Sequence, residues 1–439
     1  MGYFPELEER WAKCLRWLEL RKEQGVDLAS ERERLSAFLN GRISHLERMS
    51  RPRALAAKEP DDLDAIRRLR PKGPRQMALN LTDAQLRDRL LGAWLGRAAG
   101  CILGIPCEGM SKADIRNACR ALGVPYPLRH YWPVDPNPTR GLASKHYGVT
   151  QRKRFLLGDL SFAGADDDLA YTLLGLLILE EYGPDFTSED VGRAWMRYLP
   201  MACTAEKVAL ETLRAGRSWR VAGVKHNPYM EWIGADIRSD PWGYACPGRP
   251  QQAAEMAYRD AYLSHRYNGL YGAMYFSAAI AAAFATCDPV EALHVGLTEI
   301  PRTCRLYADL QWAFRVAPKV RTHLDAWERV QQRFGPVRGG MSTVHTNNNA
   351  CLTVWGVHIG RRDFTRAIST TVAMGYDNDC TAATVGSLVG AVIGGKNIPD
   401  HWHTPFRNRC RSYINGHEWF RIHDVCRRFA RVAEATFAE

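Results

Sequence analysis

The sequence lacks several patterns that would place it in a familiar class. Its twelve cysteines form no C-x-x-C pair, which argues against a zinc ribbon and against a dithiol redox motif. Neither H-E-x-x-H nor G-x-S-x-G occurs, so the common zinc-protease and serine-hydrolase motifs are missing. Scattered cysteines without a motif are typical of free thiols in a reducing compartment, and we expect a cytoplasmic protein.

Long apolar runs and a targeting segment are missing too. The longest uninterrupted apolar runs, such as residues 173–179, fall far short of the roughly 18 to 20 residues that a membrane span needs. The first residues show no basic-then-apolar signal pattern, and Glu6 stands where a myristoylation signal has Ser or Thr. We therefore expect neither secretion, nor a lipid anchor, nor a membrane as partner.

The chain is moderately basic, with a formal charge of +11 over 439 residues. Lys and Arg are dispersed, and no zinc finger, glycine-aromatic RNA motif or basic zipper accompanies them, which argues against nucleic acid as a partner. A solvated basic surface is the simplest interpretation, and anionic ligands are compatible with it. The hydrophobic content of 46% is enough for a large folded core.

Helical periodicity dominates the chain, whereas alternating strand patterns with hairpin turns are scarce. Residues 6–58 have the pattern of charged amphipathic helices. Their apolar residues begin at three-to-four spacing with Leu7, Trp11, Leu15 and Leu18. The charged, proline-bounded segment 60–75 has the composition of a linker. We predict an all-α protein, with an N-terminal helical extension and linker over residues 1–78 and the main domain over residues 79–439.

Two glycine-striped helices are predicted inside the main domain. The first follows Thr82, which forms a capping-box pattern with Gln85. Glycines recur at every fourth position in both helices, at Gly92, Gly96, Gly100 and Gly104 and again at Gly386, Gly390 and Gly394. Each glycine costs a helix about 1 kcal/mol, so a close approach of two backbones is the expected reason for the stripe. Between these helices, residues 125–154 have the composition of a long loop.

Two acidic clusters, more than two hundred residues apart, open apolar helical stretches. Their five carboxylates are Asp166, Asp167, Asp168, Asp377 and Asp379. Aspartates at a helix start often only cap free backbone N–H groups, and that alternative stays open for each cluster alone. Uncompensated carboxylates on buried helices are costly, however, so we favour a shared cation between the two clusters. Hard carboxylate oxygens suit Mg²⁺, Mn²⁺ or Ca²⁺ rather than zinc.

Three short motifs contain or flank these clusters. A glycine-rich element ending in G-x-P-x-E is matched by Gly104–Glu108, T-D-D-T by Asp166–Leu169, and D-x-D-[ST] by Asp377–Cys380. In this order the motifs resemble those of the ADP-ribosylglycohydrolases, and the resemblance covers most of the chain, from about residue 82 to about residue 402. Members of that family often carry Asp where this chain has Cys101.

The resemblance implies an all-α bundle around two Mg²⁺ ions, with Mn²⁺ as the alternative metal. It implies one metal site at Asp166, Asp167, Asp168 and Asp379, and a second at Glu108, Asp377, Asp379 and either Cys380 or Thr381. Asp379 would bridge the two ions. Two such ions can clamp neighbouring ribose hydroxyls and orient a water toward the anomeric carbon, and Glu108 or Asp167 would then accept the proton of that water.

Two departures from the family pattern bear on the metal. The sulfur of Cys380 is a poor Mg²⁺ ligand, and Asp166 adds a negative charge where relatives have a threonine. Thr381 would supply a hydroxyl oxygen in place of the Cys380 sulfur. Weaker similarities imply a set of substrate-binding residues, namely Gly234, Ala235, Asp236, His265 and Asn349.

By this resemblance the chain is expected to hydrolyse an N- or O-glycosidic bond to the ribose of an ADP-ribosyl group and to release ADP-ribose. Its partner would be an ADP-ribosylated protein or a small ADP-ribosyl or ribosyl glycoside. Two alternatives stay open: hydrolysis of another ribosyl glycoside, such as a nucleoside or nucleotide, and a noncatalytic descendant that binds ADP-ribose.

Overall fold

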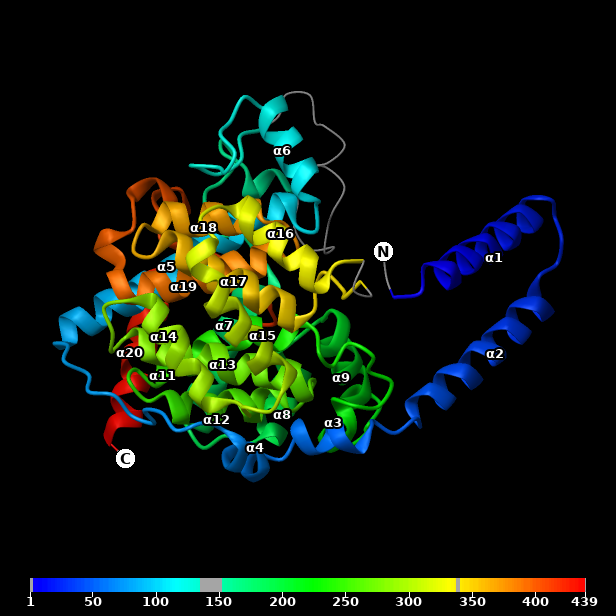
Figure 1. The fold of residues 1–439 in the computed structure, drawn as a ribbon, viewed down its shortest axis with the longest axis horizontal. Coiled ribbons are helices and arrows are strands. Elements are labelled where there is room, and N and C mark those ends of the chain that lie inside the picture. The colour runs from blue at the N-terminus through cyan, green and yellow to red at the C-terminus, as the bar shows by residue number, and fades with distance from the viewer. Residues whose placement is uncertain (1–2, 135–151, 337–339, 439) are drawn as a thin grey trace.

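The computed structural model describes residues 3–134, 152–336 and 340–438, and helices make up almost all of its regular structure (Figure 1). The helices are α1 Pro5–Glu23, α2 Ala29–Glu47, α3 Arg53–Lys58, α4 Leu63–Leu69, α5 Asp83–Gly104, α6 Lys112–Ala121, α7 Asp167–Tyr182, α8 Ser188–Tyr198, α9 Thr204–Arg214, α10 Trp219–Ala222, α11 Asp240–Ala245, α12 Pro250–Ala261, α13 Tyr267–Ala283, α14 Pro289–Gly296, α15 Arg305–Val316, α16 His323–Phe334, α17 Thr346–Gly360, α18 Phe364–Ala373, α19 Asn378–Ile393 and α20 Ile422–Ala438. Among the described residues, strands are limited to the antiparallel hairpin of β1, Arg409–Ile414, and β2, His417–Arg421. The all-α prediction is confirmed.

The predicted capping box starts helix α5. Thr82 Oγ1 accepts a hydrogen bond from the backbone N–H of Gln85 at 3.3 Å, and the Gln85 side chain accepts one from the N–H of Thr82 at 2.9 Å. The two reciprocal bonds satisfy N–H groups that have no partner inside the helix.

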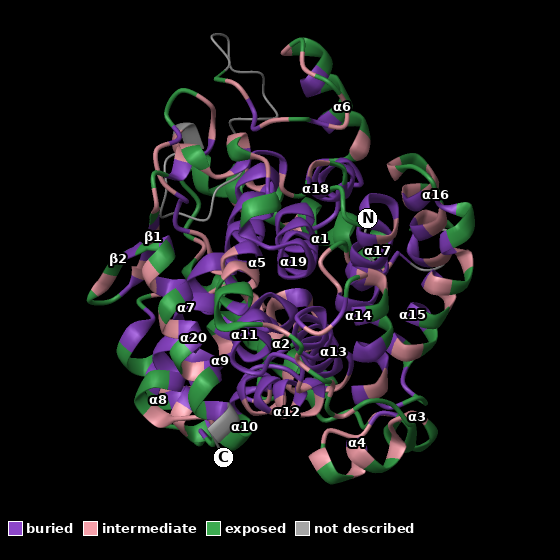
Figure 2. Ribbon diagram, turned by 90° about the vertical axis from the view of Figure 1, so that its left-hand side faces the viewer, coloured by how far each residue is buried: buried purple, intermediate pink, exposed green. Residues whose placement is uncertain are grey.

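Helices α5 and α19 pack along their glycine stripes, as predicted. A Cβ on Gly96 would lie 2.0 Å from the carbonyl oxygen of Gly386, and a Cβ on Gly92 would lie 2.3 Å from that of Gly390. The missing side chains therefore let the two backbones touch. This pair forms the centre of the buried core, surrounded by α7, α13, α17 and α18 (Figure 2).

Helix α5 has a second property that the short apolar runs of the sequence did not reveal. The stretch Asp83–Cys107 is long and apolar enough to cross a membrane by length and composition. In this fold 89% of its most apolar window is buried inside the protein, where it packs on α19. Its hydropathy is thus that of a central core helix.

The N-terminal segment has two different parts. Helices α1 and α2 project away from the body, and none of their described residues is buried (Figure 1). The segment with a linker-like composition instead contains α4, whose Ile66 is fully buried, and Arg67 of α4 pairs with Glu255 at 2.8 Å. The sequence analysis missed this docking because Leu63, Ile66 and Leu69 lie in a short segment whose composition is dominated by charged residues and proline. The division of the chain near residue 78 stays a prediction.

The predicted loop over residues 125–154 is only partly described, because residues 135–151 lie outside the described residues. Its first part packs on the body, where Tyr131 and Trp132 are buried. The Trp132 indole N–H donates to the carbonyl of Leu103 at 3.1 Å, near the end of α5.

Candidate metal centre and substrate cavity

The first acidic cluster lies at the start of α7. Asp166 is the N-cap residue, and its Oδ1 accepts from the backbone N–H of Asp168 at 3.1 Å. The capping alternative is therefore correct for Asp166. It does not explain Asp168, which is fully buried two residues further on, or Asp167, which lines a cavity.

Arg97 of α5 holds Asp168 in the core. The guanidinium is completely buried and donates to Asp168 Oδ1 at 3.0 Å and to Asp240 Oδ2 at 2.7 Å. It also bonds the backbone carbonyl of Asp168 at 2.8 Å. Asp168 Oδ2 has no hydrogen-bond partner among the described residues, so this oxygen is available to a cation.

The second acidic cluster lies at the start of α19. Asp377 is the N-cap residue, but its side chain makes no capping hydrogen bond, so the capping alternative fails here. Asn378 fixes the turn, because its amide donates to the carbonyl of Val372 at 3.2 Å. Asp379 follows directly, and a Cβ on Gly104 would lie 2.3 Å from the Asp379 Cα. The last glycine of the α5 stripe therefore lets Asp379 approach the end of α5, beyond which Glu108 follows.

The two clusters meet in space. Three groups of side chains each place one ligand atom per residue within 4.8 Å of the others: Cys101, Asp166 and Asp168; Asp168, Asp379 and Cys380; and Glu108, Asp377 and Asp379. Asp168 and Asp379 each belong to two of the groups, and the bridging role of Asp379 stays a prediction. Cys101 is an addition, since its thiol lies 3.5 Å from Asp166 Oδ1.

Burial makes these carboxylates costly to ionise. It is the main cause that raises the pKa of Asp166 and of Asp379, and the neighbouring carboxylates raise both further. Burial also raises the pKa of Asp168 to about 7, although Arg97 opposes the change. A divalent cation would compensate this charge directly.

The donor set fits a hard divalent cation. Asp379 Oδ1 is buried and, like Asp168 Oδ2, has no hydrogen-bond partner among the described residues, so two oxygens of adjoining groups remain to be satisfied. Carboxylate oxygens are the ligands that Mg²⁺ and Mn²⁺ prefer. The sulfurs of Cys101 and Cys380 are the part of the set that fits less well, and burial raises the pKa of both thiols well above the usual range.

Thr381 lies outside the lining of the cavity, and its role as a metal ligand stays a prediction. Its side chain is buried, and its hydroxyl donates to the backbone carbonyl of Asp377 at 3.0 Å, one turn earlier in α19. Cys380 lines the cavity instead. The helix rotates Thr381 by about 100° from Cys380, so the two neighbours cannot face the same point.

A cavity of about 100 Å³ lies against the acidic groups. Its lining consists of Glu108, Asp167, Cys203, Thr204, Glu206, Trp232, Ile233, Gly234, Ile237, Val344, Asp377, Asp379 and Cys380. Both predicted catalytic carboxylates, Glu108 and Asp167, are therefore exposed to the same small space.

Glu206 of α9 is a further acidic residue in this lining that the sequence analysis missed. It is buried and pairs with Arg238 at 2.7 Å. Burial raises its pKa to about 7, while Arg238 opposes the change. No motif surrounds Glu206 in the sequence. Its place in the cavity depends on the packing of α9 against the segment around Gly234. The packing is close, because a Cβ on Gly234 would lie 2.3 Å from Glu206 Oε1.

The five predicted substrate-binding residues divide into two layers. Gly234 lines the cavity, whereas Ala235, Asp236, His265 and Asn349 are almost completely buried outside this lining. Asn349 supports the centre, because its Oδ1 accepts from the N–H of Asp377 at 3.3 Å. Both carboxylate oxygens of Asp236 are buried without a hydrogen-bond partner among the described residues. A substrate-binding role for these residues stays a prediction.

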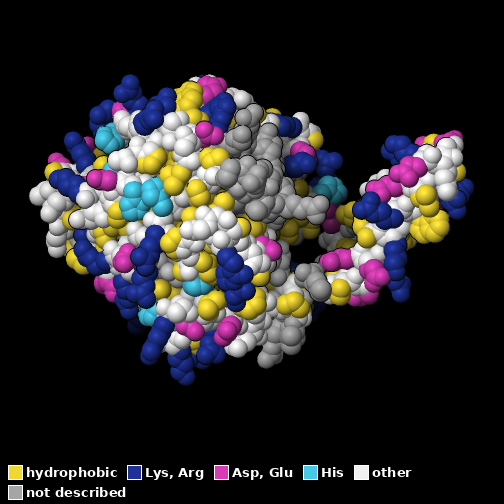
Figure 3. Space-filling view, turned by 90° about the horizontal axis from the view of Figure 1, so that it is seen from above, with side chains coloured by type: hydrophobic (Ala, Val, Ile, Leu, Met, Phe, Trp, Pro, Cys, Tyr) yellow, Lys and Arg dark blue, Asp and Glu magenta, His cyan; other side chains and the backbone are white. Residues whose placement is uncertain are grey.

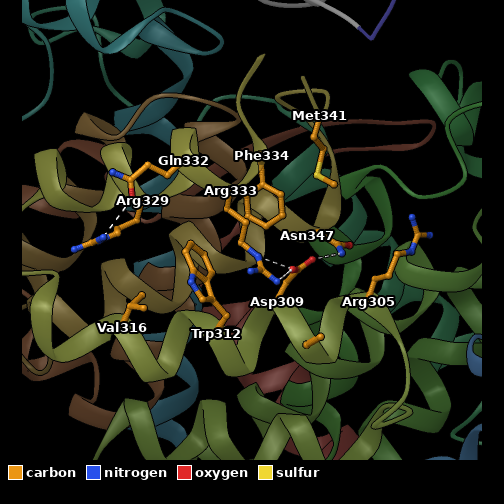
Figure 4. Close-up of a pocket in the computed structure, with 11 residues that line it drawn as sticks. Arg305, Asp309, Trp312, Val316, Arg329, Gln332, Arg333, Phe334, Met341 and Asn347 are labelled. Carbon is orange, nitrogen blue, oxygen red and sulfur yellow. Dashed lines mark hydrogen bonds and ion pairs between the residues drawn. The ribbon is translucent and has the colours of Figure 1, made fainter. Parts of the chain in front are cut away.

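A second, larger cavity of about 600 Å³ opens between α15 and α16 (Figure 4). Arg305, Arg329 and Arg333 line it together with the aromatic rings of Trp312 and Phe334. Additional lining residues are Ala308, Asp309, Val316, Gln332, Met341 and Asn347. The short segment between α16 and α17 reaches both cavities, since it places Met341 at this one and Val344 at the acidic one.

The fold and the site together define an all-α protein with an acidic centre suited to divalent metal. A family model described as ADP-ribosylglycohydrolase matches residues 82–436, and the chain belongs to this family of hydrolases. The match begins at the residue where the sequence predicted it and extends past residue 402, through β1, β2 and nearly all of α20.

One solved structure described as an ADP-ribosylglycohydrolase-related protein complex is 21% identical in sequence, with a TM-score of 0.52. The alignment covers 80% of this chain and 99% of that one, and at this identity it supports the fold alone. No curated protein sequence matches the chain.

Proposed function

We propose that the protein hydrolyses the N- or O-glycosidic bond at the anomeric carbon of the ribose in an ADP-ribosyl group, and that it releases ADP-ribose. The observation that carries this proposal is the group of Glu108, Asp377 and Asp379 at the wall of a small cavity, which shares Asp379 with a second group that contains Asp168. The family is a glycohydrolase family, and the substrate and the bond are the proposed refinement.

The acidic groups would hold two divalent ions, Mg²⁺ or Mn²⁺. Asp168 and Asp379 each carry a buried oxygen with no hydrogen-bond donor among the described residues, which favours a bound cation. When bound, such ions supply Lewis-acid contacts to ribose hydroxyls and to water.

A carboxylate in the cavity would accept the proton of the attacking water as positive charge develops on the ribose ring. Glu108 and Asp167 are the two candidates, since both line the cavity beside Asp379. Burial raises the pKa of Asp167, which improves a carboxylate as a proton acceptor near neutral pH. Arg238 pairs with Glu206, which lines the same cavity, at 2.7 Å.

The two cavities would divide an ADP-ribosyl group between them. The acidic cavity of about 100 Å³ is well below the roughly 300 to 1,000 Å³ of pockets that enclose drug-sized ligands, so a whole nucleotide does not fit there. The neighbouring cavity of about 600 Å³ offers arginines for phosphate and aromatic rings for a base. The segment between α16 and α17 contributes a residue to each cavity, Val344 to the acidic one and Met341 to the larger one.

The proposed partners are ADP-ribosylated proteins or small ADP-ribosyl compounds in the cytoplasm. All twelve cysteines lie in the described part of the chain and are free thiols, which supports a reducing compartment.

The test is an incubation of the purified protein with ADP-ribosylated protein, with ADP-ribosyl-arginine and ADP-ribosyl-serine peptides, and with nucleosides. Each reaction contains Mg²⁺, Mn²⁺ or a chelator, and the products are identified by mass spectrometry. We expect ADP-ribose from an ADP-ribosyl substrate, only with metal present. The matched variants are Asp379→Asn, which is expected to be inactive, and Asp400→Asn, whose side chain is 91% exposed and which is expected to be fully active.

Two other outcomes would replace the proposal. Free base released from nucleosides, with no ADP-ribose from any ADP-ribosyl substrate, would make the protein a nucleoside hydrolase. Binding of ADP-ribose without turnover of any substrate, in the presence of metal, would make it a noncatalytic member of the family.

A further inference from the structure

Among the described residues, helices α1 and α2 bury no side chain against the body of the protein. We call residues 5–47 the N-terminal arm. None of its described residues is buried, and it projects from the body with apolar, acidic and basic side chains interspersed on its surface (Figure 3). Exposed fractions of 55% for Leu7, 58% for Trp17 and 62% for Phe38 are unusual for side chains of this size.

A helix of this kind needs a packing surface. Isolated helices of 12 to 15 residues are only marginally stable in water, and helices in proteins gain most of their stability by packing an apolar face. Each helix of the arm has 19 residues, or about 28 Å at 1.5 Å per residue, and no residue of either helix is buried, although Cys14, Leu18, Leu35 and Leu39 are only partly exposed. A partner is therefore required to explain why the sequence keeps an apolar seam here.

The spacing of the apolar residues identifies the type of packing. In α1, Leu7, Trp11, Cys14 and Leu18 follow one another at intervals of four, three and four residues. In α2, Leu35, Leu39 and Leu46 lie on one face at intervals of four and seven residues, with Arg42 at the intervening position of the repeat. Such a seam is typical of helices that pack side by side in coiled coils and four-helix bundles, with knobs of one helix in holes of the next.

The charge of the arm identifies the partner. Residues 5–47 contain nine acidic and eight basic residues, so the arm has a net charge of only −1, and the formal +11 of the chain comes from the remaining residues. A surface of balanced charge is not selected for an anionic membrane or for nucleic acid, which attract basic segments. It is complementary to another surface that also carries both signs, and a second copy of the same arm is such a surface.

We infer that the arm is a dimerisation element, which pairs with the arm of a second copy of this chain into a four-helix bundle. Two copies related by a twofold axis present the same seam to each other, as in most homodimers. Contacts at the base of the arm join it to the body. Glu47 pairs with His226 at 2.7 Å, and the Arg51 guanidinium lies 3.4 Å from the centre of the Tyr267 ring.

The test is the mass of the full chain in solution, measured by sedimentation equilibrium from about 1 to 100 µM. We expect twice the chain mass for the wild type and the single chain mass for the Trp11→Glu/Leu18→Glu double variant, which places charge in the seam. The control is Leu20→Glu, on the opposite face of α1, which is expected to stay dimeric. The midpoint of thermal unfolding of the body should be the same in all three proteins.

A wild-type protein that has the single chain mass at every concentration would overturn the inference, and so would a dimer that the double variant preserves. Co-sedimentation of a monomeric wild type with phosphatidylserine–phosphatidylcholine vesicles would assign the arm to a membrane surface instead. These measurements need no catalytic readout, so they are independent of the proposed glycohydrolase activity.

Discussion

Arg97 and Asp168 form an ion pair in the centre of the fold, with 3.0 Å between Arg97 Nη2 and Asp168 Oδ1 and no exposure of either side chain to solvent. The same guanidinium bonds Asp240 at 2.7 Å. One oxygen of Asp168 is thus held by the protein, while the other has no hydrogen-bond partner among the described residues, and Asp168 belongs to the same group as Asp379 and Cys380. The pair orients an acidic residue toward the candidate metal centre.

Replacing Arg97 by methionine is expected to destabilise the fold by roughly 3 to 5 kcal/mol, because two buried carboxylates lose their cation. The measurement is denaturant unfolding in the presence of a chelator. Arg87→Met is the control on the same helix, since Arg87 is 59% exposed and lies 3.7 Å from Glu434, and its loss should cost less than about 1 kcal/mol. Equal effects of the two substitutions would contradict a structural role for the buried pair.

Much of the fold could be predicted from local patterns. The capping box at Thr82, the two glycine stripes and the acidic residues at the starts of α7 and α19 are each visible within a few consecutive residues, and each is found where it was expected. The family resemblance supplied the order in which the acidic motifs meet.

The parts that the sequence did not predict depend on distant contacts. Arg97 and Glu206 have no motif around them, and only the packing of α5 on α7 and of α9 beside the cavity reveals their roles. The rotation of Thr381 away from the cavity follows from the orientation of α19, which periodicity alone does not fix. Cys101 joined the candidate ligands for the same reason, because its neighbour Asp166 is distant in sequence.

The close packing of α5 on α19 predicts a large effect of a single methyl group. Gly96→Ala would place a Cβ 2.0 Å from the carbonyl oxygen of Gly386, and the two backbones would have to separate. We expect a loss of about 3 kcal/mol or more in the free energy of unfolding, at the upper end of overpacking effects. The control is Gly41→Ala in α2, where nothing lies within 4 Å and where alanine should favour the helix by about 1 kcal/mol. A neutral Gly96→Ala variant would show that the two helices do not touch as described.

The shared position of Asp379 predicts different metal stoichiometries for two neighbouring variants. Asp379 belongs to two candidate groups and Asp377 to one, so Asp379→Asn should abolish the binding of both ions, whereas Asp377→Asn should leave one. Isothermal titration with Mn²⁺ measures the number directly. In the metal-free protein Asp379→Asn is expected to raise the thermal midpoint, because it removes a buried charge that lacks a partner. Two ions bound to Asp379→Asn would contradict the bridging position.

The raised pKa of Glu206 predicts a pH-dependent stability. Because burial raises this pKa to about 7 from an ordinary value of 4.5, the folded protein holds a proton that the unfolded chain has lost between these two pH values. The contribution of Glu206 to the free energy of unfolding is therefore fully present below pH 4.5 and is lost as the pH rises to 7. The loss is about 3 kcal/mol at most. Glu206→Gln should thus gain stability relative to the wild type between pH 5 and pH 8, measured by urea unfolding at each pH. The exposed Glu328→Gln on α16 is the control and should follow the wild type. The raised pKa would be contradicted if the difference in free energy of unfolding between Glu206→Gln and the wild type were the same at pH 5 and at pH 8.

The division of the substrate between two cavities predicts an effect of Arg329 on binding without an effect on chemistry. Arg329 lines the larger cavity, and its side chain bonds only Gln332 among the described residues, at 3.3 Å, so its guanidinium is available to a phosphate. Arg329→Ala should raise the KM for an ADP-ribosyl substrate about tenfold, which corresponds to about 1.4 kcal/mol, while kcat changes little.

The control is Arg315→Ala, which replaces an exposed arginine on α15 outside the lining and should leave both constants unchanged. A ribosyl substrate without phosphates, if it is hydrolysed at all, should have the same KM with wild type and Arg329→Ala. An unchanged KM of Arg329→Ala for the ADP-ribosyl substrate would exclude the larger cavity from phosphate recognition and leave the acidic cavity as the only supported part of the site.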